Sequence, residues 1–139
     1  MKILDLSQKI VNFEGESIPR SSTNKDDTLL KHVLLTYIRS ANSMGIKEHE
    51  RTIIFELGSR ISNTKGKIEL SQGEYDSLKR LADDGKTEGS TQQKGQYIFS
   101  IEISEQVKKM INAAEDVLDG KDETEKEKVK DQKGENNES

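Results

Sequence analysis

The sequence predicts a small single domain of the α+β class, and three observations support this prediction. The chain has 139 residues, the length of one domain. Several segments show apolar residues at helical spacing, whereas YIFSIEI at 97–103 alternates between two faces as a strand does. Hydrophobic residues make up only 30% of the chain. An average globular domain has about 45–50%, so the core must be thin.

The first predicted elements are a β-hairpin and a pair of helices. The hairpin lies in LSQKIVNFEGESIPR at 6–20 and turns at Glu14-Gly15. Asp26 or Asp27 is placed to cap a helix in TLLKHVLLTYIRSA at 28–41. A second helix is expected from about residue 47 to 61, with Gly58 on its apolar stripe. The short connection predicts antiparallel packing, and Gly58 would allow the two helices to approach closely.

A third helix is predicted to begin with a capping box. After a short edge strand at 67–70, the hydroxyl of Ser71 can accept a hydrogen bond from the amide of Glu74, and the Glu74 carboxylate can accept one from the amide of Ser71. Leu70 and Tyr75 stand at the positions of a hydrophobic staple. Gly85 is expected to end the helix.

The last third of the chain predicts a loop, a strand, a helix and a tail. Residues 83–96 contain three glycines and no apolar residue, which is typical of a flexible loop. The alternating strand at 97–103 is expected to precede an amphipathic helix from Ser104 to Gly120. The domain would therefore span 1–120. Residues 121–139 hold one hydrophobic residue among mixed charges, so this charged tail is predicted to be disordered or a frayed extension of the last helix.

Composition excludes several functional classes. The chain has no cysteine, which removes disulfides, thiolate metal sites and cysteine nucleophiles. Its net charge of −4 gives no bulk attraction to nucleic acid or to an anionic membrane. No segment approaches the about 20 apolar residues of a membrane span, and the first 13 residues lack the apolar core of a secretory signal. We expect a soluble cytoplasmic protein without membrane contact.

A calcium loop is the nearest approach to a metal motif, and its register argues against it. With Gly66 at position 6 of such a loop, Ile68 fits position 8. However, Ile61, Lys65 and Gln72 would then occupy ligand positions 1, 5 and 12. A hydrocarbon, a cation and an amide cannot replace the carboxylates that calcium requires there. The segment is interpreted as a structural turn, and no metal or cofactor is predicted.

No catalytic constellation is visible, so the protein is not expected to be an enzyme and no catalytic residue is assigned. The two histidines, His32 and His49, fall away from the apolar stripes of their helices and are interpreted as solvated surface residues. No serine lies in a Gly-x-Ser-x-Gly elbow. Gly-Lys-Thr at 85–87 lacks the earlier glycine and the preceding buried strand of a phosphate-binding loop.

One cluster could contact a partner or a single-stranded nucleic acid. It combines cations around the predicted loop with aromatic residues on the predicted strand, where bases could stack. The alternative interpretation is that the aromatic residues form the core face of the strand. The members of the cluster are Lys79, Arg80, Lys86, Lys94, Tyr97 and Phe99.

The order of four segments resembles a set of small uncharacterised proteins of tailed phages and prophages. The segments are FEGESIP, DDTLLKHVLLTYI, IIFELGSRISN and GKIELSQGEYDSLKRL, within about residues 9–82. The strand predicted at 97–103 and the charged tail depart from that pattern. The resemblance consists of structural signals and implies no functional residues.

These observations favour a non-enzymatic protein-interaction module. The resemblance implies a phage or prophage accessory or regulatory protein that binds a host or virion protein in the host cytoplasm. A single-stranded nucleic-acid-binding protein is the first alternative, and a virion assembly factor is the second.

Overall fold

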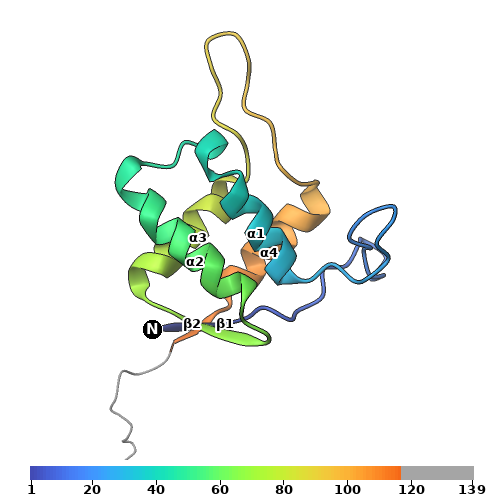
Figure 1. Cartoon of the computed structure of the whole chain (residues 1–139). Coiled ribbons are helices and arrows are strands. Elements are labelled where there is room, and N and C mark those ends of the chain that lie inside the picture. The colour runs from blue at the N-terminus through green and yellow to red at the C-terminus, as the bar shows by residue number, and fades with distance from the viewer. Residues whose placement is uncertain (117–139) are drawn as a thin grey trace, which may run out of the picture.

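The computed structural model describes residues 1–116 and shows an α+β domain, which confirms the predicted class. The four helices run beside one another, and a small antiparallel sheet lies at one end of them (Figure 1). The helices are α1 (Leu30–Arg39), α2 (Arg51–Ser62), α3 (Gln72–Asp84) and α4 (Ile101–Asn112). The strands are β1 (Lys2–Asp5), β2 (Lys67–Leu70) and β3 (Glu115–Asp116).

The sheet joins three distant parts of the chain, with the strand order β2-β1-β3. β1 pairs antiparallel with β2, so that Lys2 lies opposite Leu70 and Asp5 lies opposite Lys67. On its other side, β1 pairs with the two residues of β3. The strand predicted at 67–70 is therefore confirmed.

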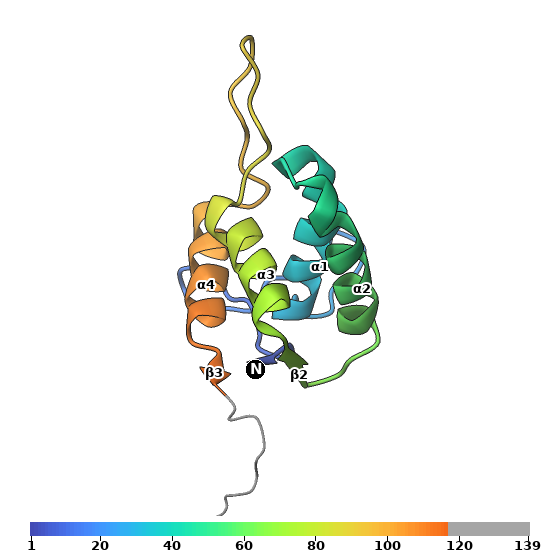
Figure 2. The same cartoon turned by 90° about the vertical axis from the view of Figure 1, so that its left-hand side faces the viewer.

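The core lies between the sheet and the four helices. Each helix contributes its apolar stripe, and β1 and β2 contribute the side chains on their inner faces. α1 and α2 run antiparallel as predicted and are joined through two short 3₁₀ segments, η1 (Ala41–Met44) and η2 (Glu48–Glu50) (Figure 2). The fully buried large side chains include Leu4, Leu34, Tyr37, Leu57, Leu78 and Ile111.

The predicted N-terminal hairpin is present as a turn rather than as two strands. The amide of Asn12 donates to the carbonyl of Glu16 at 2.9 Å, and Gly15 adopts a φ of +82° at the predicted turn. Only an isolated bridge between Val11 and Ser17 follows. α4 holds this segment, because the side-chain amide of Gln106 both accepts from the amide and donates to the carbonyl of Val11. The N-terminal strand of the sheet is β1, which precedes the turn.

The start and end of α3 agree with the prediction. The amide of Glu74 donates to the hydroxyl of Ser71 at 3.2 Å, and the amide of Ser71 donates to the carboxylate of Glu74 at 2.9 Å. Leu70 and Tyr75, the predicted staple residues, are both buried. At the other end, Gly85 caps the helix with a φ of +61°.

The strand predicted at 97–103 is wrong, because α4 begins at Ile101. Ser100 is the residue before the helix and adopts extended backbone angles, so the cap lies four residues before the predicted Ser104. Ile103 is half-buried on the same stripe as Val107 and Ile111, whereas Ile101 is 68% exposed. As a helix, the segment joins Ile103 to the buried stripe of Val107 and Ile111. Over so few positions, the alternation of apolar residues fits the period of a helix as well as the period of a strand.

The end of α4 also differs from the prediction. The helix ends at Asn112, and the chain turns through Ala113 into β3. Ala114 packs against the core beyond the helix. The predicted helical residues after 116, the domain boundary at 120 and the tail at 121–139 lie outside the described residues.

Residues 86–97 form an arm that projects from the end of the domain opposite the sheet (Figure 2). Its two sides are joined because the amide of Thr87 donates to the carbonyl of Gln96 at 2.8 Å. The amide of Glu88 donates to the carbonyl of Ser43, which ties the base of the arm to η1. The predicted flexibility of this segment stays a prediction.

The two serines that precede α3 and α4 provide a matched test of capping. Ser71→Ala should lower the free energy of unfolding by about 1 kcal/mol, because the mutation removes a cap hydrogen bond. Ser100 makes no side-chain cap hydrogen bond, so Ser100→Ala should change the stability by less than about 0.5 kcal/mol. Urea unfolding of both variants measures the difference, and equal losses would contradict the assignment.

Candidate functional site

Two of the predicted contact residues are engaged in ion pairs. Lys79 pairs with Asp83 on the next turn of α3, with 2.6 Å between Nζ and Oδ2. The guanidinium of Arg80 pairs with the carboxylate of Glu50 in η2. These two cations therefore already have carboxylate partners and do not form an open basic patch.

The other four members of the predicted cluster separate into exposed and packed residues. The Nζ of Lys86 lies 5.7 Å from the ring centroid of Tyr97, and both side chains are exposed at the base of the arm. Lys94 is exposed on the arm. Phe99 is half-buried and packs edge-on against Tyr37, with ring centroids 5.2 Å apart. Lys86, Lys94 and Tyr97 are the exposed members of the cluster.

The polar groups of the turn after α2 form hydrogen bonds that hold the backbone. The hydroxyl of Thr64 donates to the carbonyl of Arg60 at 2.6 Å, and the carbonyl of Thr64 accepts from Nζ of Lys31 at 2.9 Å. Gly66 has a φ of +77°, and its carbonyl accepts a hydrogen bond from the amide of Leu6. Within residues 1–116, no group of three or more His, Asp or Glu side chains could hold a metal ion.

An apolar groove lies between α1 and α2, with a volume of about 630 Å³. α1 contributes Leu35 and Ile38 to its lining, and α2 contributes Ile54 and Phe55. The polar residues of α2 in the lining are Thr52, Ser59 and Ser62. Because these three and Phe55 are exposed, the groove is a trough open to solvent rather than an enclosed cavity.

The groove displays an aromatic side chain in a chain that has few. The sequence contains three Phe and three Tyr residues. Three of these six side chains are more than two-thirds exposed, namely Phe13 at 77%, Phe55 at 75% and Tyr97 at 68%. Of the three, Phe55 is the one that lines the groove.

The floor of the groove depends on the close approach predicted at Gly58. A Cβ at this position would lie 3.1 Å from Cγ2 of Ile38. That distance is shorter than an ordinary contact between carbon atoms. Glycine therefore lets α1 and α2 pack closely at this point, where Ile38 lies against Gly58.

The cations of the groove lie at one end of it. Arg39 is in the last turn of α1, and Arg51 is the first residue of α2. The antiparallel helices bring these two ends together (Figure 2). The guanidinium of Arg51 donates to the side-chain oxygen of Asn42, which also lines the groove. No carboxylate belongs to the groove lining, and among the described residues none forms an ion pair with either arginine.

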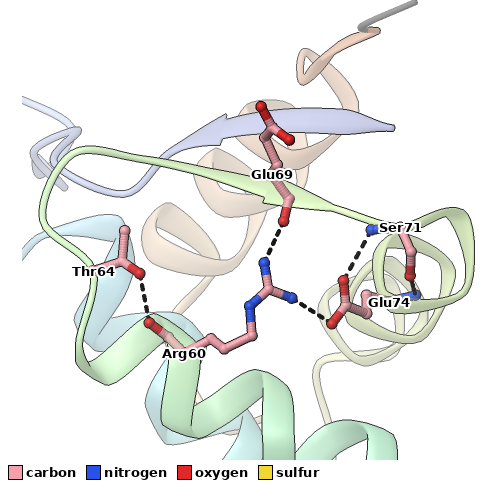
Figure 3. Close-up of polar contacts among 5 residues, drawn as sticks. All are labelled: Arg60, Thr64, Glu69, Ser71 and Glu74. Atoms are coloured by element: carbon pink, nitrogen blue, oxygen red, sulfur yellow. Dashed lines mark hydrogen bonds and ion pairs between the residues drawn. The ribbon is translucent and has the colours of Figure 1, made fainter. Parts of the chain in front are cut away.

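Arg60, in the last turn of α2, holds this helix to its neighbours (Figure 3). Its guanidinium pairs with the carboxylate of Glu74 at 2.5 Å and donates to the carbonyl of Glu69 in β2 at 2.6 Å. Burial by itself raises the pKa of Glu74, but hydrogen bonds from Ser71 and Arg60 outweigh it and lower the pKa below its usual value. One side chain thus connects α2 to β2 and to the start of α3.

A second link holds the start of α2. The carboxylate of Glu50, directly before α2, accepts from Arg80 and, at 3.3 Å, from the hydroxyl of Ser77. Both partners belong to α3. Glu50 is therefore directed towards α3, away from its neighbour Arg51 at the groove. The two links fix α2 at both ends without using the groove face.

α1 forms the other wall of the groove, and His32 holds the start of this helix. Its Nδ1 accepts a hydrogen bond from the amide of Leu29 at 3.0 Å, so the helix is capped by His32. The predictions that Asp26 or Asp27 caps α1 and that His32 is a solvated surface residue are both wrong. Asp27 instead pairs with Lys9, and His32 is half-buried. His49 is exposed as predicted.

The prediction from sequence missed the groove residues Ile38, Arg39, Arg51 and Phe55. Phe55 had a visible signal, because it lies beside the buried stripe of Ile54, Leu57 and Ile61 rather than on it. The arginines had no such signal, since a charged residue at the end of a helix is common. Their role depends on how α1 and α2 meet, which the sequence does not show directly.

Comparison of the chain with protein-family models, curated proteins and solved structures finds no match. Among the described helices, none has the length and apolar character needed to cross a membrane.

The hydrogen bond at His32 predicts a stability that depends on pH. Burial, and then the charges of Arg20 and Lys31, lower the pKa of His32 below 6.5. The unfolded chain therefore binds the proton more readily, so this stabilisation is present above about pH 6.5 and is lost as the pH falls through the lower folded pKa. We expect the free energy of unfolding to decrease between about pH 7 and pH 5, above the range where carboxylates titrate.

The two histidines provide the control for this prediction. His32→Ala should remove the slope between about pH 7 and pH 5, whereas His49→Ala should retain it. Urea unfolding at several pH values measures both slopes. A slope that persists in His32→Ala would show that another group is responsible.

Proposed function

We propose that the protein is a non-enzymatic interaction module that binds a helical segment of a protein partner in the groove between α1 and α2. The observation that supports this proposal is the exposed Phe55 in an apolar trough of about 630 Å³. Amphipathic helices commonly bind by placing apolar anchors in a groove of this kind. The anchors of a partner would pack on Phe55 and Ile38.

The composition of the lining supports a protein partner. The centres of protein interfaces are enriched in aromatic residues and arginine and depleted in Lys, Glu and Asp. The groove lining contains Phe55, Arg39 and Arg51 and has no Lys, Glu or Asp. Small-molecule sites usually bury most of the ligand surface. A trough with one open side suits one face of a helix better.

The dimensions of the walls suit a short helix. α1 has 10 residues and α2 has 12. At a rise of about 1.5 Å per residue, the walls are about 15 and 18 Å long. A partner helix of about three turns would lie along them and present apolar residues at i, i+3, i+4 and i+7.

The resemblance to small proteins of tailed phages and prophages suggests the biological setting of this module. In that setting the protein would be an accessory or regulatory protein, and its partner would be a host or virion protein in the host cytoplasm. A role in virion assembly would use the same groove with a virion protein. The resemblance rests on the pattern of structural signals within residues 9–82 and stays a prediction.

A single-stranded nucleic-acid-binding function is the second candidate. The pair of Lys86 and Tyr97 supports it, because an exposed ring beside a cation can stack a base and contact a phosphate. The pairing of Lys79 and Arg80 with carboxylates and the packing of Phe99 leave few groups for this role. The groove therefore supports the protein-binding function better.

The groove function can be tested with two equally exposed phenylalanines. Phe55→Ala should weaken retention of the partner at least about tenfold, as expected for an aromatic hot spot. Phe13 is as exposed but lies on the N-terminal turn, so Phe13→Ala should retain the partner. The measurement is affinity capture from the producing cells with the full chain and both variants, with melting temperatures as the control for folding. Loss of retention in both variants, or in neither, would contradict the groove function.

The nucleic-acid function predicts binding that depends on salt and on Tyr97. If the arm binds single strands, the full chain should be retained on single-stranded DNA at low salt, and Tyr97→Ala should reduce retention. Lys86→Glu reverses the charge beside the ring and serves as the baseline without binding. Because we favour the groove function, we expect the full chain to be retained no better than this variant. Retention that disappears in both Tyr97→Ala and Lys86→Glu would favour this second candidate over the first.

A further inference from the structure

The end of the groove near η1 and η2 holds two arginines that form no ion pair with a carboxylate of residues 1–116. Arg51 is oriented by Asn42, a neutral amide, so its hydrogen bond positions the guanidinium but leaves its charge intact. Arg39 lies across from it at the end of α1 and is exposed. The nearest acidic residue in sequence, Glu50, is directed to Arg80 and Ser77 instead.

The two charges flank apolar surface. Ile38 precedes Arg39, and the groove lining continues from Arg51 to Phe55 along α2. Guanidinium groups bind carboxylates with two parallel hydrogen bonds, which makes arginine selective for acidic partners. A ligand with an apolar stripe and carboxylates at one end would match both features.

We infer that the occupant of the groove is an acidic amphipathic helix of a partner protein, whose carboxylates bind Arg39 and Arg51 while its apolar stripe packs on Ile38 and Phe55. This inference rests on the proposed function, to which it adds the chemistry of the partner. The charge complementarity supports it, since the groove lining has two cations and no anion in a chain of net charge −4.

Three synthetic helices of about 18 residues test this chemistry. They share one apolar stripe and carry Glu, Gln or Lys at the flanking positions near one end. Fluorescence anisotropy with the full chain should give the tightest binding for the Glu peptide, at least about tenfold tighter than for the Lys peptide. The difference should shrink between about 0.1 and 1 M salt, as the screening length falls from about 10 to 3 Å.

Charge reversal in the protein assigns the preference to the two arginines. In R39E/R51E the order of the peptides should invert, so that the Lys peptide binds best. The control is K86E/K94E, which changes the net charge equally but lies on the arm and should leave the order unchanged. Equal affinity for all three peptides, or inversion in the control as well, would overturn the acidic preference.

Phe55→Ala separates this inference from the proposed function. If all peptides bind equally and Phe55→Ala abolishes the binding, the groove function stands and only the acidic preference fails. If Phe55→Ala leaves the binding unchanged, or no peptide binds, both fail. Two further outcomes would give the groove another occupant and overturn the inference. These are Phe55-dependent binding of a peptide with the sequence of residues 117–139, and a dimer in sedimentation that Phe55→Ala dissociates.

Discussion

The structure depends on the pairing of β1 with two strands that are far away in sequence. β1 lies in the middle of the sheet, with β2 on one side and β3 on the other. α1 and α2 lie between β1 and β2 in the chain, and α3 and α4 lie between β2 and β3. The β1–β2 ladder therefore closes a loop that contains α1 and α2, and the β1–β3 ladder closes a longer loop that contains all four helices. The entropy lost in closing such long loops must be offset by burial, and Leu4, Ile68 and Leu70 bring the sheet into the common core.

A thin core explains why polar links position α2. Only Ile54, Leu57 and Ile61 of this helix are buried. Three aliphatic side chains determine which face of the helix is buried, but they constrain the positions of its ends weakly. Arg60 joins the last turn to β2 and α3, and Glu50 joins the region before the first turn to α3. Because both links lie on the side facing α3, the opposite side of α2 is left open beside α1.

Local signals in the sequence predicted what depends on local interactions. The capping box at Ser71, the stop at Gly85 and the turn at Gly15 each need only a few neighbouring residues. The predicted strand at 97–103 failed because its alternation also fits the stripe of α4, and only the packing of Val107 and Ile111 decides between them. β3 is too short to leave a pattern. The groove itself could not be predicted, since it results from the distance and angle between two helices.

The exposed aromatic residues differ in what surrounds them, and this difference distinguishes the groove from the rest of the surface. Leaving a phenylalanine exposed forgoes about 1.5–3 kcal/mol of burial. Tyr97 recovers part of such a loss through the contact between its ring and the Nζ of Lys86. Phe13 lies on the N-terminal turn, and it is not part of the groove lining. Of the three, Phe55 is the one that lines the apolar groove, whose lining also includes Ile38, Arg39 and Arg51. The groove therefore places an exposed aromatic ring next to other apolar side chains, so that covering it would recover part of the burial that Phe55 forgoes.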